Sequence, residues 1–558
     1  MHTKTSGLLL VFLAAAAVNP ASAQEPRSGT PPAPVPARSD LEKLKGQLEA
    51  QREQLRKLQA EVQRQQELVD RAAAAAANPW QADNLIASTQ PVVASIVVPA
   101  AAPALNAPDA AGASMVKPNS AEEAAPLSFR IGMANLTPVG FLDFTTVTRS
   151  TAPGTGIGTN FGGIPFRNTA QGGLTETRFS AQNSRIGLRL DTKFRETKVL
   201  GYLEADFLGF VPTNAAVSSN SDSLRLRLYF ADLRRGKIEV LGGQSWSMLT
   251  PGRNGISPLP ADLFYSQNID VNYQAGLVWS RDPQFRVVYH PHDRVAMGVS
   301  LEASEQYIGG SAGGGTVVLP SALVTPYNNQ LDNGGTTLSV PSVRPDIVAK
   351  IAFDPSVNGR HVHFELAGVD RFFRTFNTLT GQHFSKDGGG VQANLAADLT
   401  RNFRLVSANY WSDGGGRWMF GQAPDLVVRG DGSISPVHSG SAIGGFEIQV
   451  NRTQFSAYYG GIYIGRSVAI DPSNNQPVGY GYKGSGNGQN RTIQEITFDL
   501  NQTLWRDAKY GAVNLMFQYS YLTRSPWYVA ADAPKNASEN LAFFDLRYTL
   551  PGAAPAIK

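Results

Sequence analysis

Arginine and carboxylate side chains alternate with apolar residues in neighbouring segments of the chain. The segment Leu224–Leu228 reads Leu-Arg-Leu-Arg-Leu. Successive side chains of an extended strand point to opposite faces, so we expect all three leucines on one face and both arginines on the other. The same alternation in the nearby segments predicts one charged face, made of Arg178, Arg185, Arg189, Glu204, Asp206, Arg225 and Arg227.

This charged face has two possible roles. Adjacent strands lie about 4.8 Å apart, so arginines and carboxylates on neighbouring strands can form ion pairs that hold a wall together. Alternatively, five arginines against two acids make a net positive wall, and such a wall attracts anions when it lines a narrow passage. The sequence is compatible with both interpretations.

Residue patterns for catalysis or metal binding are weak. The chain has no cysteine, which excludes thiolate metal sites, disulfides and cysteine nucleophiles. It has no H-E-x-x-H pattern, and its G-x-S-x-G match, at residues 309–313, lies in a Gly-rich loop and not at the strand-to-helix elbow that a serine nucleophile needs. His361 and His363 share a face, but no third ligand stands at a readable spacing, and His290 and His292 fall in a predicted tight turn. We therefore predict no enzyme, no catalytic residue, no metal site and no cofactor.

The elements that carry these residues follow from a hydrophobic period of two between residues 137 and 550. Short turns and long Gly/Ser/Asn-rich loops alternate strictly between the apolar-polar segments, whereas a soluble sandwich usually ends its hairpins symmetrically. We predict an all-β, antiparallel transmembrane barrel of about 16 strands over residues 127–550, with an even strand number and both ends on the short-turn side. The candidate strands are 137–149, 175–193, 198–211, 222–235, 237–248, 277–290, 294–303, 344–354, 361–372, 388–400, 402–413, 438–450, 453–464, 491–503, 511–523 and 540–550.

One strand of this barrel is expected to be irregular. Phe179 and Ile186 have opposite parity within the segment 175–193. A β-bulge near Asn183 and Ser184 would turn both apolar side chains to the outer face.

The third long loop, 249–276, is a candidate constriction. It contains Asp262, Tyr265 and Asp270. Loop order in barrels of this size predicts that it folds into the lumen, where an acidic loop facing a basic wall would create a transverse field. An ordinary surface loop is the alternative.

Composition divides the region before the barrel. The apolar stretch from Leu8 to Val18, followed by Ala21-Ser22-Ala23, predicts a cleaved signal peptide over residues 1–23. A Pro-rich segment (24–39) and an Ala/Pro-rich linker (72–126) flank a heptad segment, and a short tail (551–558) follows the barrel. No later apolar run reaches the ~20 residues of a spanning helix. The formal net charge of +4 gives no support for nucleic-acid binding.

Residues 40–71 predict a coiled-coil helix. The 3-4 spacing of the heptad positions is unbroken. Two of these positions hold Gln in place of an apolar residue, which would weaken the seam. A single amphipathic helix packed on its own barrel is the alternative. The predicted seam consists of Leu41, Leu44, Leu48, Leu55, Leu58, Val62 and Val69.

This order of segments resembles the DcaP-like trimeric porins of bacterial outer membranes. Within the barrel the resemblance covers roughly residues 129–550 and rests on five short motifs: Thr177–Ser180, Ser184–Gly187, Gly201–Phe207, Leu224–Arg227 and Gly242–Ser247. It implies a homotrimer in outer-membrane lipid with a periplasmic N-terminal coiled coil. It also implies passage of small anionic solutes such as dicarboxylates, with the arginines as basic pore lining.

Two other functions stay open. The barrel could anchor a structural tether whose N-terminal segment contacts the cell wall. It could also be a sugar-specific porin, although the expected inward set is mostly charged, amide and hydroxyl residues instead of aromatic ones. The C-terminus departs from the family pattern, because Pro551 to Lys558 follow Leu550 where such barrels usually end on an aromatic residue.

Overall fold

The computed structural model describes residues 127–210, 223–264, 266–310, 315–327, 329–333, 340–341 and 344–551, together with Glu53. The predicted signal peptide, Pro-rich segment, linker, coiled-coil seam and residues 552–558 of the tail lie outside the described residues. In the part of the chain that is described, no helix is both long and apolar enough to cross a membrane.

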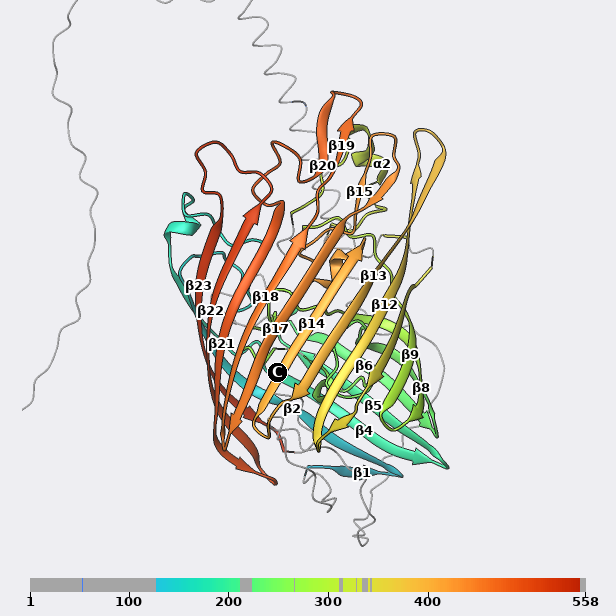
Figure 1. Cartoon of the computed structure of the whole chain (residues 1–558), viewed down its shortest axis with the longest axis vertical. Coiled ribbons are helices and arrows are strands. Elements are labelled where there is room, and N and C mark those ends of the chain that lie inside the picture. Colours follow the sequence, from blue (N-terminus) through green and yellow to red (C-terminus); the bar gives the residue numbers. More distant parts are fainter. Residues whose placement is uncertain are drawn as a thin grey trace, which may run out of the picture. The chain divides into compact units, whose positions relative to one another are not determined.

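The described chain forms a closed antiparallel β-barrel of sixteen strands (Figure 1). Each wall strand pairs with its neighbour in sequence, and β2 pairs with β23, from Phe141 opposite Thr549 to Arg149 opposite Leu541, which closes the ring. The wall strands are β2 (Ala134–Arg149), β3 with β4 (Glu176–Ser180 and Arg185–Phe194, one interrupted strand), β5 (Thr197–Asp206), β6 (Arg225–Arg235), β7 (Ile238–Trp246), β8 (Arg281–His292), β9 (Val295–Glu302), β10 (Asp346–Phe353), β12 (Arg360–Asn377), β13 (Gln382–Asp398), β14 (Phe403–Asp413), β17 (His438–Val450), β18 (Thr453–Ile464), β21 (Asn490–Asp507), β22 (Gly511–Pro526) and β23 (Ala537–Thr549). The predicted barrel is confirmed, and each candidate strand overlaps a wall strand. The bounds differ most where β12 ends and β13 begins, at Asn377 and Gln382 instead of the predicted 372 and 388.

Shorter elements decorate the two ends of the barrel. On the short-turn side, β1 (Phe129–Ile131) pairs with β2 and β11 (Ser356–Val357) pairs with β12. Among the long loops, β15 (Leu426–Val428) pairs with β16 (Ile434–Pro436), and β19 (Ser467–Asp471) pairs with β20 (Gln476–Tyr480). The described helical turns are η1 (Gln171–Gly173), η2 (Pro260–Asp262), η3 (Ser321–Leu323), α2 (Val324–Tyr327) and η5 (Gly416–Trp418). Figure 1 shows the long loops gathered at one end and the short turns at the other.

Side-chain alternation separates an apolar outside from a polar inside. On β23, Phe544 and Leu546 are exposed, whereas the alternate residues Asp545 and Arg547 are fully buried. The same alternation along the wall exposes large apolar side chains on nearly every strand. Such a continuous exposed apolar surface is unfavourable in water and suits a barrel that faces lipid.

The expected bulge in the second wall strand is present. β2 pairs Thr145 with Ser180 of β3 and Phe141 with Arg185 of β4. The three β2 residues 142–144 therefore lie opposite four residues, 181–184. As a result Phe179 and Ile186 are 58% and 47% exposed on the outer face, as the sequence predicted.

A second bulge was not predicted, and it changes which side chains of the Leu-Arg-Leu-Arg-Leu segment face inward. Glu204 of β5 pairs with Leu228, but its neighbour Ala205 pairs with Leu226, so Arg227 is the extra residue. The bulge turns Leu228 inward, where it is 0% exposed, while Leu224 and Leu226 remain exposed. The expectation that all three leucines share one face is therefore wrong, because a single inserted residue reverses the parity of every later side chain.

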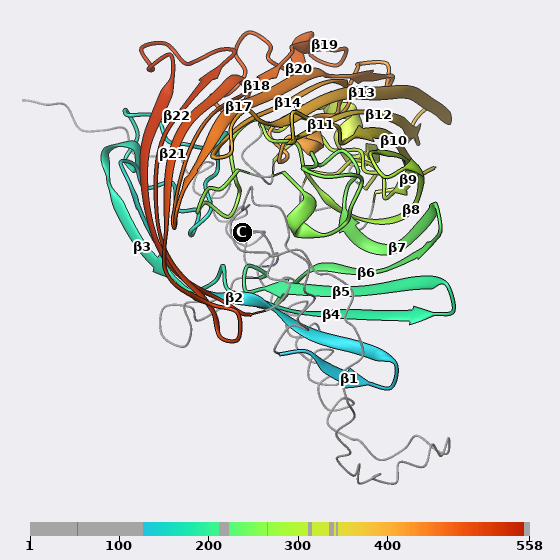
Figure 2. The same cartoon turned by 60° about the horizontal axis from the view of Figure 1, so that its bottom comes forward.

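Long loops fill much of the barrel interior at the long-loop end. The inward-facing wall residues Val147, Phe373 and Phe543 belong to one buried apolar cluster with the loop residues Phe161 and Trp418. Figure 2, turned to bring the short-turn end forward, shows loop segments within the ring of strands. The interior is thus a packed structure around a polar wall, and any passage must run between the loops and that wall.

Candidate functional site

Five of the seven predicted wall residues form one ion-pair cluster across β4, β5 and β6, here called the arginine cluster: Arg185, Glu204, Asp206, Arg225 and Arg227. Arg227 donates hydrogen bonds to Glu204 Oε1 and to Asp206 Oδ2, both at 2.7 Å. Arg225 donates to both carboxylate oxygens of Asp206, at 3.0 and 2.8 Å. Arg185 Nη1 lies 3.5 Å from Glu204 Oε1. The bulge at Arg227 brings it beside Arg225, so that both contact the same carboxylate.

The other two predicted arginines lie apart from this cluster, each beside a further carboxylate. Arg178 pairs with Glu176 at 2.9 Å, and Arg189 pairs with Asp191 at 2.8 Å. Sequence reasoning did not include these two acids, although residues two apart on a strand share a face. Glu176 also pairs with Arg149, at 2.7 Å. The expected excess of positive charge is therefore smaller: six arginines face four carboxylates, where the sequence suggested five arginines facing two.

Arg281, at the start of β8, is a further cation of this region that the sequence did not indicate. Its guanidinium carbon lies 5.2 Å from the ring centroids of both Trp246 and Trp279. Among the described residues it forms no ion pair. Asp206 lies in its surroundings, but that carboxylate is already paired with Arg225 and Arg227, so the direct contacts of Arg281 are the two tryptophan rings. Alternation could not reveal it, because Trp279 comes from the inward-folded loop and not from a regular strand.

The loop between β7 and β8 crosses the inside of the barrel. The backbone N–H of Gly252 donates to Glu365 Oε1 of β12 at 3.0 Å. Further along, the N–H of Ala275 donates to Glu495 Oε2 of β21 at 2.8 Å. Between them, the N–H of Ile269 donates to Gln518 Oε1 of β22 at 2.6 Å. The loop therefore contacts the wall opposite to the strands from which it starts. Its role in narrowing the passage stays a prediction.

The predicted loop residues have different surroundings. Asp262 ends η2 and is half-buried, and burial raises the pKa of its carboxyl against the opposing effect of hydrogen bonds from Ser257 and Asn254. Asp270 is buried and accepts hydrogen bonds from the backbone N–H groups of Thr159 and Asn272. Tyr265 lies outside the described residues.

Tyr273, which the sequence did not single out as a site residue, connects the loop to the arginine cluster. It has a positive φ of 68°, unusual for a bulky residue. Its hydroxyl accepts a hydrogen bond from Arg227 Nη2 at 3.5 Å. Burial alone would raise the pKa of Tyr273, but the charges of Arg227, Arg185 and Arg281 outweigh burial and lower it. The potential at this point of the loop is therefore positive.

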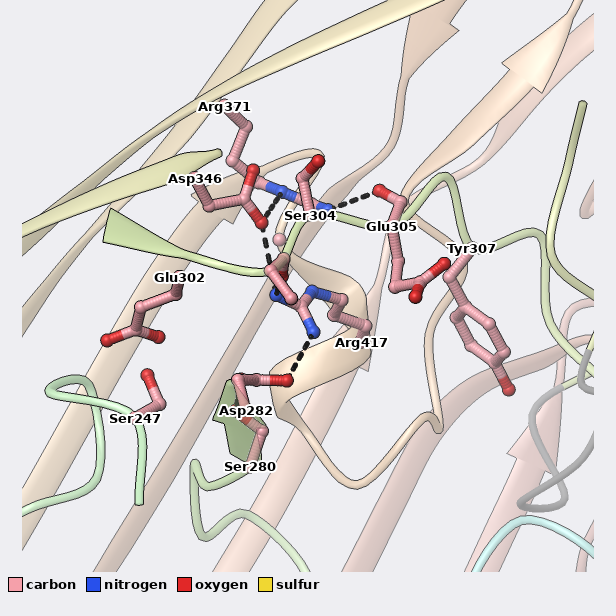
Figure 3. Close-up of polar contacts among 12 residues, drawn as sticks. Ser247, Ser280, Asp282, Glu302, Ser304, Glu305, Tyr307, Asp346, Arg371 and Arg417 are labelled. Atoms are coloured by element: carbon pink, nitrogen blue, oxygen red, sulfur yellow. Dashed lines mark hydrogen bonds and ion pairs between the residues drawn. The ribbon is translucent and has the colours of Figure 1, made fainter. Parts of the chain in front are cut away.

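A second polar cluster fixes the loop between β14 and β17 inside the barrel (Figure 3). Arg417 of η5 contacts Asp346 at 3.0 Å and Asp282 at 3.3 Å. Arg371 of β12 contacts Asp346 at 3.2 Å and Asp425 at 2.6 Å. These paired charges bind the loop to β8, β10 and β12, so they hold the structure together and leave few charges for a solute.

Aromatic side chains are more frequent inside the barrel than the sequence predicted. Tyr202 stacks on Phe230 at 5.6 Å, and Trp279 stacks on Phe420 at 5.2 Å and meets Tyr273 edge-on at 5.3 Å. The expectation of a mostly charged, amide and hydroxyl interior is therefore wrong for this sector. These rings pack against one another and are largely buried, so they offer little open ring surface to a passing sugar.

His361 and His363, the pair that shares a face, are engaged by other polar groups. His363 uses both ring nitrogens, at 2.7 Å from Asp354 Oδ1 and 3.2 Å from Glu365 Oε2. His361 Nε2 lies 3.0 Å from the carbonyl oxygen of Arg253. Among the described residues no three histidine or carboxylate side chains are grouped so that they could hold a metal ion.

The architecture defines the chain as a closed, sixteen-stranded antiparallel β-barrel with inward-folded loops. No protein-family model and no curated protein matches it. Among solved structures it is similar to the outer membrane channel DcaP of Acinetobacter baumannii, with 16% sequence identity and a TM-score of 0.55 over 76% of this chain and 99% of that one. This likeness establishes the fold and confirms at that level the resemblance noted in the sequence.

Two further structures match less well. The anion-selective porin from Comamonas acidovorans is 12% identical, with a TM-score of 0.41 over 75% of this chain and 100% of its own. Pseudomonas putida OprB is 11% identical, with a TM-score of 0.40 over 74% of this chain and 94% of its own. With TM-scores below 0.5, neither adds to the assignment of the fold.

Proposed function

We propose that this protein is an outer-membrane porin through which small hydrophilic solutes diffuse passively. The observation that carries the proposal is the closed barrel with an apolar outer face, a charged inner wall and a loop that crosses its interior. A barrel with this inside-out polarity satisfies every backbone hydrogen bond in lipid and offers solutes a polar route.

We further propose a preference for anions, including dicarboxylates. Most arginines of the wall are paired, so the support comes from Arg281, which has no ion-pair partner among the described residues, and from Arg225, which is paired but accessible. Arg281 has two tryptophan rings as partners, and Arg225 keeps 39% of its side chain exposed beside Asp206. In a passage of intermediate dielectric, one such charge attracts an anion by about 1–4 kcal/mol at close range, before screening by salt.

The assembly and its orientation are part of the same proposal. A homotrimer with a periplasmic coiled coil is supported by the heptad spacing of residues 40–71 and by the family resemblance. Short turns face the periplasm in bacterial barrels, and β2 begins on that side. The tether hypothesis predicts that deleting residues 24–126 detaches the envelope, whereas the porin hypothesis predicts that conductance survives the deletion.

Reversal-potential measurements in planar bilayers with a KCl gradient test the proposal. We expect single-channel conductance with chloride more permeant than potassium. Replacing Arg281→Gln should lower the chloride-to-potassium permeability ratio a few-fold, whereas the matched control Arg235→Gln, whose side chain is 73% exposed, should leave it unchanged. Absence of conductance would refute the porin. Conductance that does not distinguish the ions would refute the anion preference alone.

A further inference from the structure

A separate cavity lies at the short-turn end of the barrel, between the inward-folded loop and the wall. Its volume is about 290 Å³, and loop residues 254–259 and 262 form one side of it. The ends of β5 to β9 nearest the short turns, together with Asp354 just after β10, form the other side. None of the arginine-cluster residues lines it.

Carboxylates dominate the charged lining of this cavity. Asp232, Glu239, Asp262, Asp293 and Asp354 face two basic side chains, Arg234 and His290. The basic groups and their neighbours compensate only part of this charge. Glu239 pairs with His290 at 3.0 Å and lies 3.9 Å from Arg234, and Asp354 pairs with His363 at 2.7 Å.

Asp232 and Asp262 are left without a cationic partner. Neither forms an ion pair with any described residue, although Arg234 and Arg286 lie in the surroundings of Asp232 and Arg189 in those of Asp262. Asp232 is only 8% exposed, and its Oδ1 atom has no hydrogen-bond partner. A buried carboxylate oxygen without a partner is costly, so a cation that supplies the missing donor would be bound favourably.

The remaining lining indicates what kind of cation fits. Leu200, Ile256, Leu259 and Val295 add apolar surface beside the carboxylates. The volume corresponds to about ten water molecules, which is too large for a bare metal ion. The described carboxylates and histidines also form no group of three able to hold such an ion. An ammonium group on a short aliphatic chain satisfies both parts of the lining.

We propose that this cavity binds a small aliphatic diamine. One ammonium group pairs with Asp232 on the wall and the other with Asp262 on the loop, while the methylene chain packs against the apolar residues. The site shares no residue with the arginine cluster, so diamine binding is measured independently of the proposed ion preference. An occupied cavity would bind the loop to β6 more firmly.

Calorimetric titration of the full-length protein in detergent micelles with 1,5-diaminopentane tests this site. We expect saturable binding to the wild type and no binding of pentane-1,5-diol, which has the same length but no charge. Asp232→Asn and Asp262→Asn should each weaken binding about ten- to a hundredfold, as for the loss of a charged hydrogen bond. The matched control Glu196→Gln removes an equal charge from a side chain that is 81% exposed and outside the cavity, and it should bind like the wild type.

Three outcomes would overturn the proposal. The first is absence of diamine binding to the wild type, and the second is wild-type affinity in both cavity variants. The third is binding of MgCl2 as tight as that of the diamine, with the same sensitivity to the variants. Cooperative thermal unfolding of each variant verifies folding. The neutral Asn replacements remove an unpaired buried charge, so they are expected to preserve the fold.

Discussion

The two arginines of β6, Arg225 and Arg227, have different surroundings although one residue separates them. Arg227 is 3% exposed and lies between Glu204 and Asp206, whereas Arg225 keeps 39% of its side chain accessible and contacts Asp206 alone. Removing the partner of a buried charge is strongly destabilising. Arg227 pairs with two buried carboxylates, Glu204 and Asp206, whereas loss of Arg225 leaves Asp206 still paired with Arg227. The two residues are therefore expected to serve structure and selectivity respectively.

Replacing each of them by Gln separates these roles. Arg227→Gln leaves Glu204 and Asp206 with fewer positive charges, so it should lower the free energy of unfolding by about 3–5 kcal/mol. Arg225→Gln should change stability by less than about 1 kcal/mol and reduce the chloride preference. Urea unfolding in detergent and reversal potentials measure the two effects. Equal loss of stability in both variants would contradict this division.

At the scale of elements, a few contacts hold the inward-folded loop against the far wall. Arg253 donates hydrogen bonds to both oxygens of Glu447 on β17, at 2.9 and 2.6 Å, and its guanidinium lies 5.0 Å from the ring centroid of Phe264. Tyr458 also donates to Glu447, at 2.8 Å. The bidentate pair fixes both the position and the orientation of the loop.

Arg253→Met should loosen the loop, because it removes the bidentate pair while retaining apolar packing on Phe264. We expect larger single-channel conductance with wider scatter and a weaker ion preference, since the loop no longer holds one position. The control Arg429→Met alters a loop residue whose hydrogen bond to Ser435 is exposed and should leave conductance unchanged. Wild-type conductance in Arg253→Met would mean that other contacts hold the loop.

Sequence alternation was sufficient to predict the wall but not the contacts inside it. The period of two identified all sixteen strands, and the parity change between Phe179 and Ile186 revealed the first bulge. The position of the second bulge was harder to predict, because residues 228–230 are all apolar or aromatic and only the pairing with β5 shows that the parity changes at Arg227. The contact between Arg281 and Trp279 could not be predicted from the sequence either, since it depends on where an irregular loop folds.

At the scale of the whole molecule, a buried charge cluster joins the first and last wall strands. Arg547 of β23 contacts both Asp143 of β2 and Asp545 of its own strand, and all three side chains are almost fully buried. Asn183, in the bulge after β3, donates a hydrogen bond to Asp143 at 3.1 Å. The seam of the barrel is therefore closed by paired charges as well as by the β2–β23 ladder.

Arg547→Met should weaken this seam by leaving two buried carboxylates side by side. We expect a loss of about 3–5 kcal/mol in unfolding free energy and earlier heat-induced unfolding on electrophoresis in mild detergent. Adding Asp143→Asn to that variant should restore part of the stability, since it removes one of the unpaired charges. If the double variant is no more stable than the single one, the loss arises from packing over Phe141, whose ring centroid lies 4.3 Å from the guanidinium carbon of Arg547, and not from charge.

The same seam has a consequence for the time course of folding. Asp143 and Arg547 meet across 404 positions of the chain, so the ring cannot close until its last strand has been synthesised and delivered. Contacts this distant in sequence make folding slow, because a large loss of chain entropy precedes their formation. Throughout that interval, the apolar face of every strand is exposed to water and prone to aggregation. We therefore expect that a chaperone which keeps the strands apart before the ring closes affects the yield of folded protein more strongly than the stability of the finished barrel does.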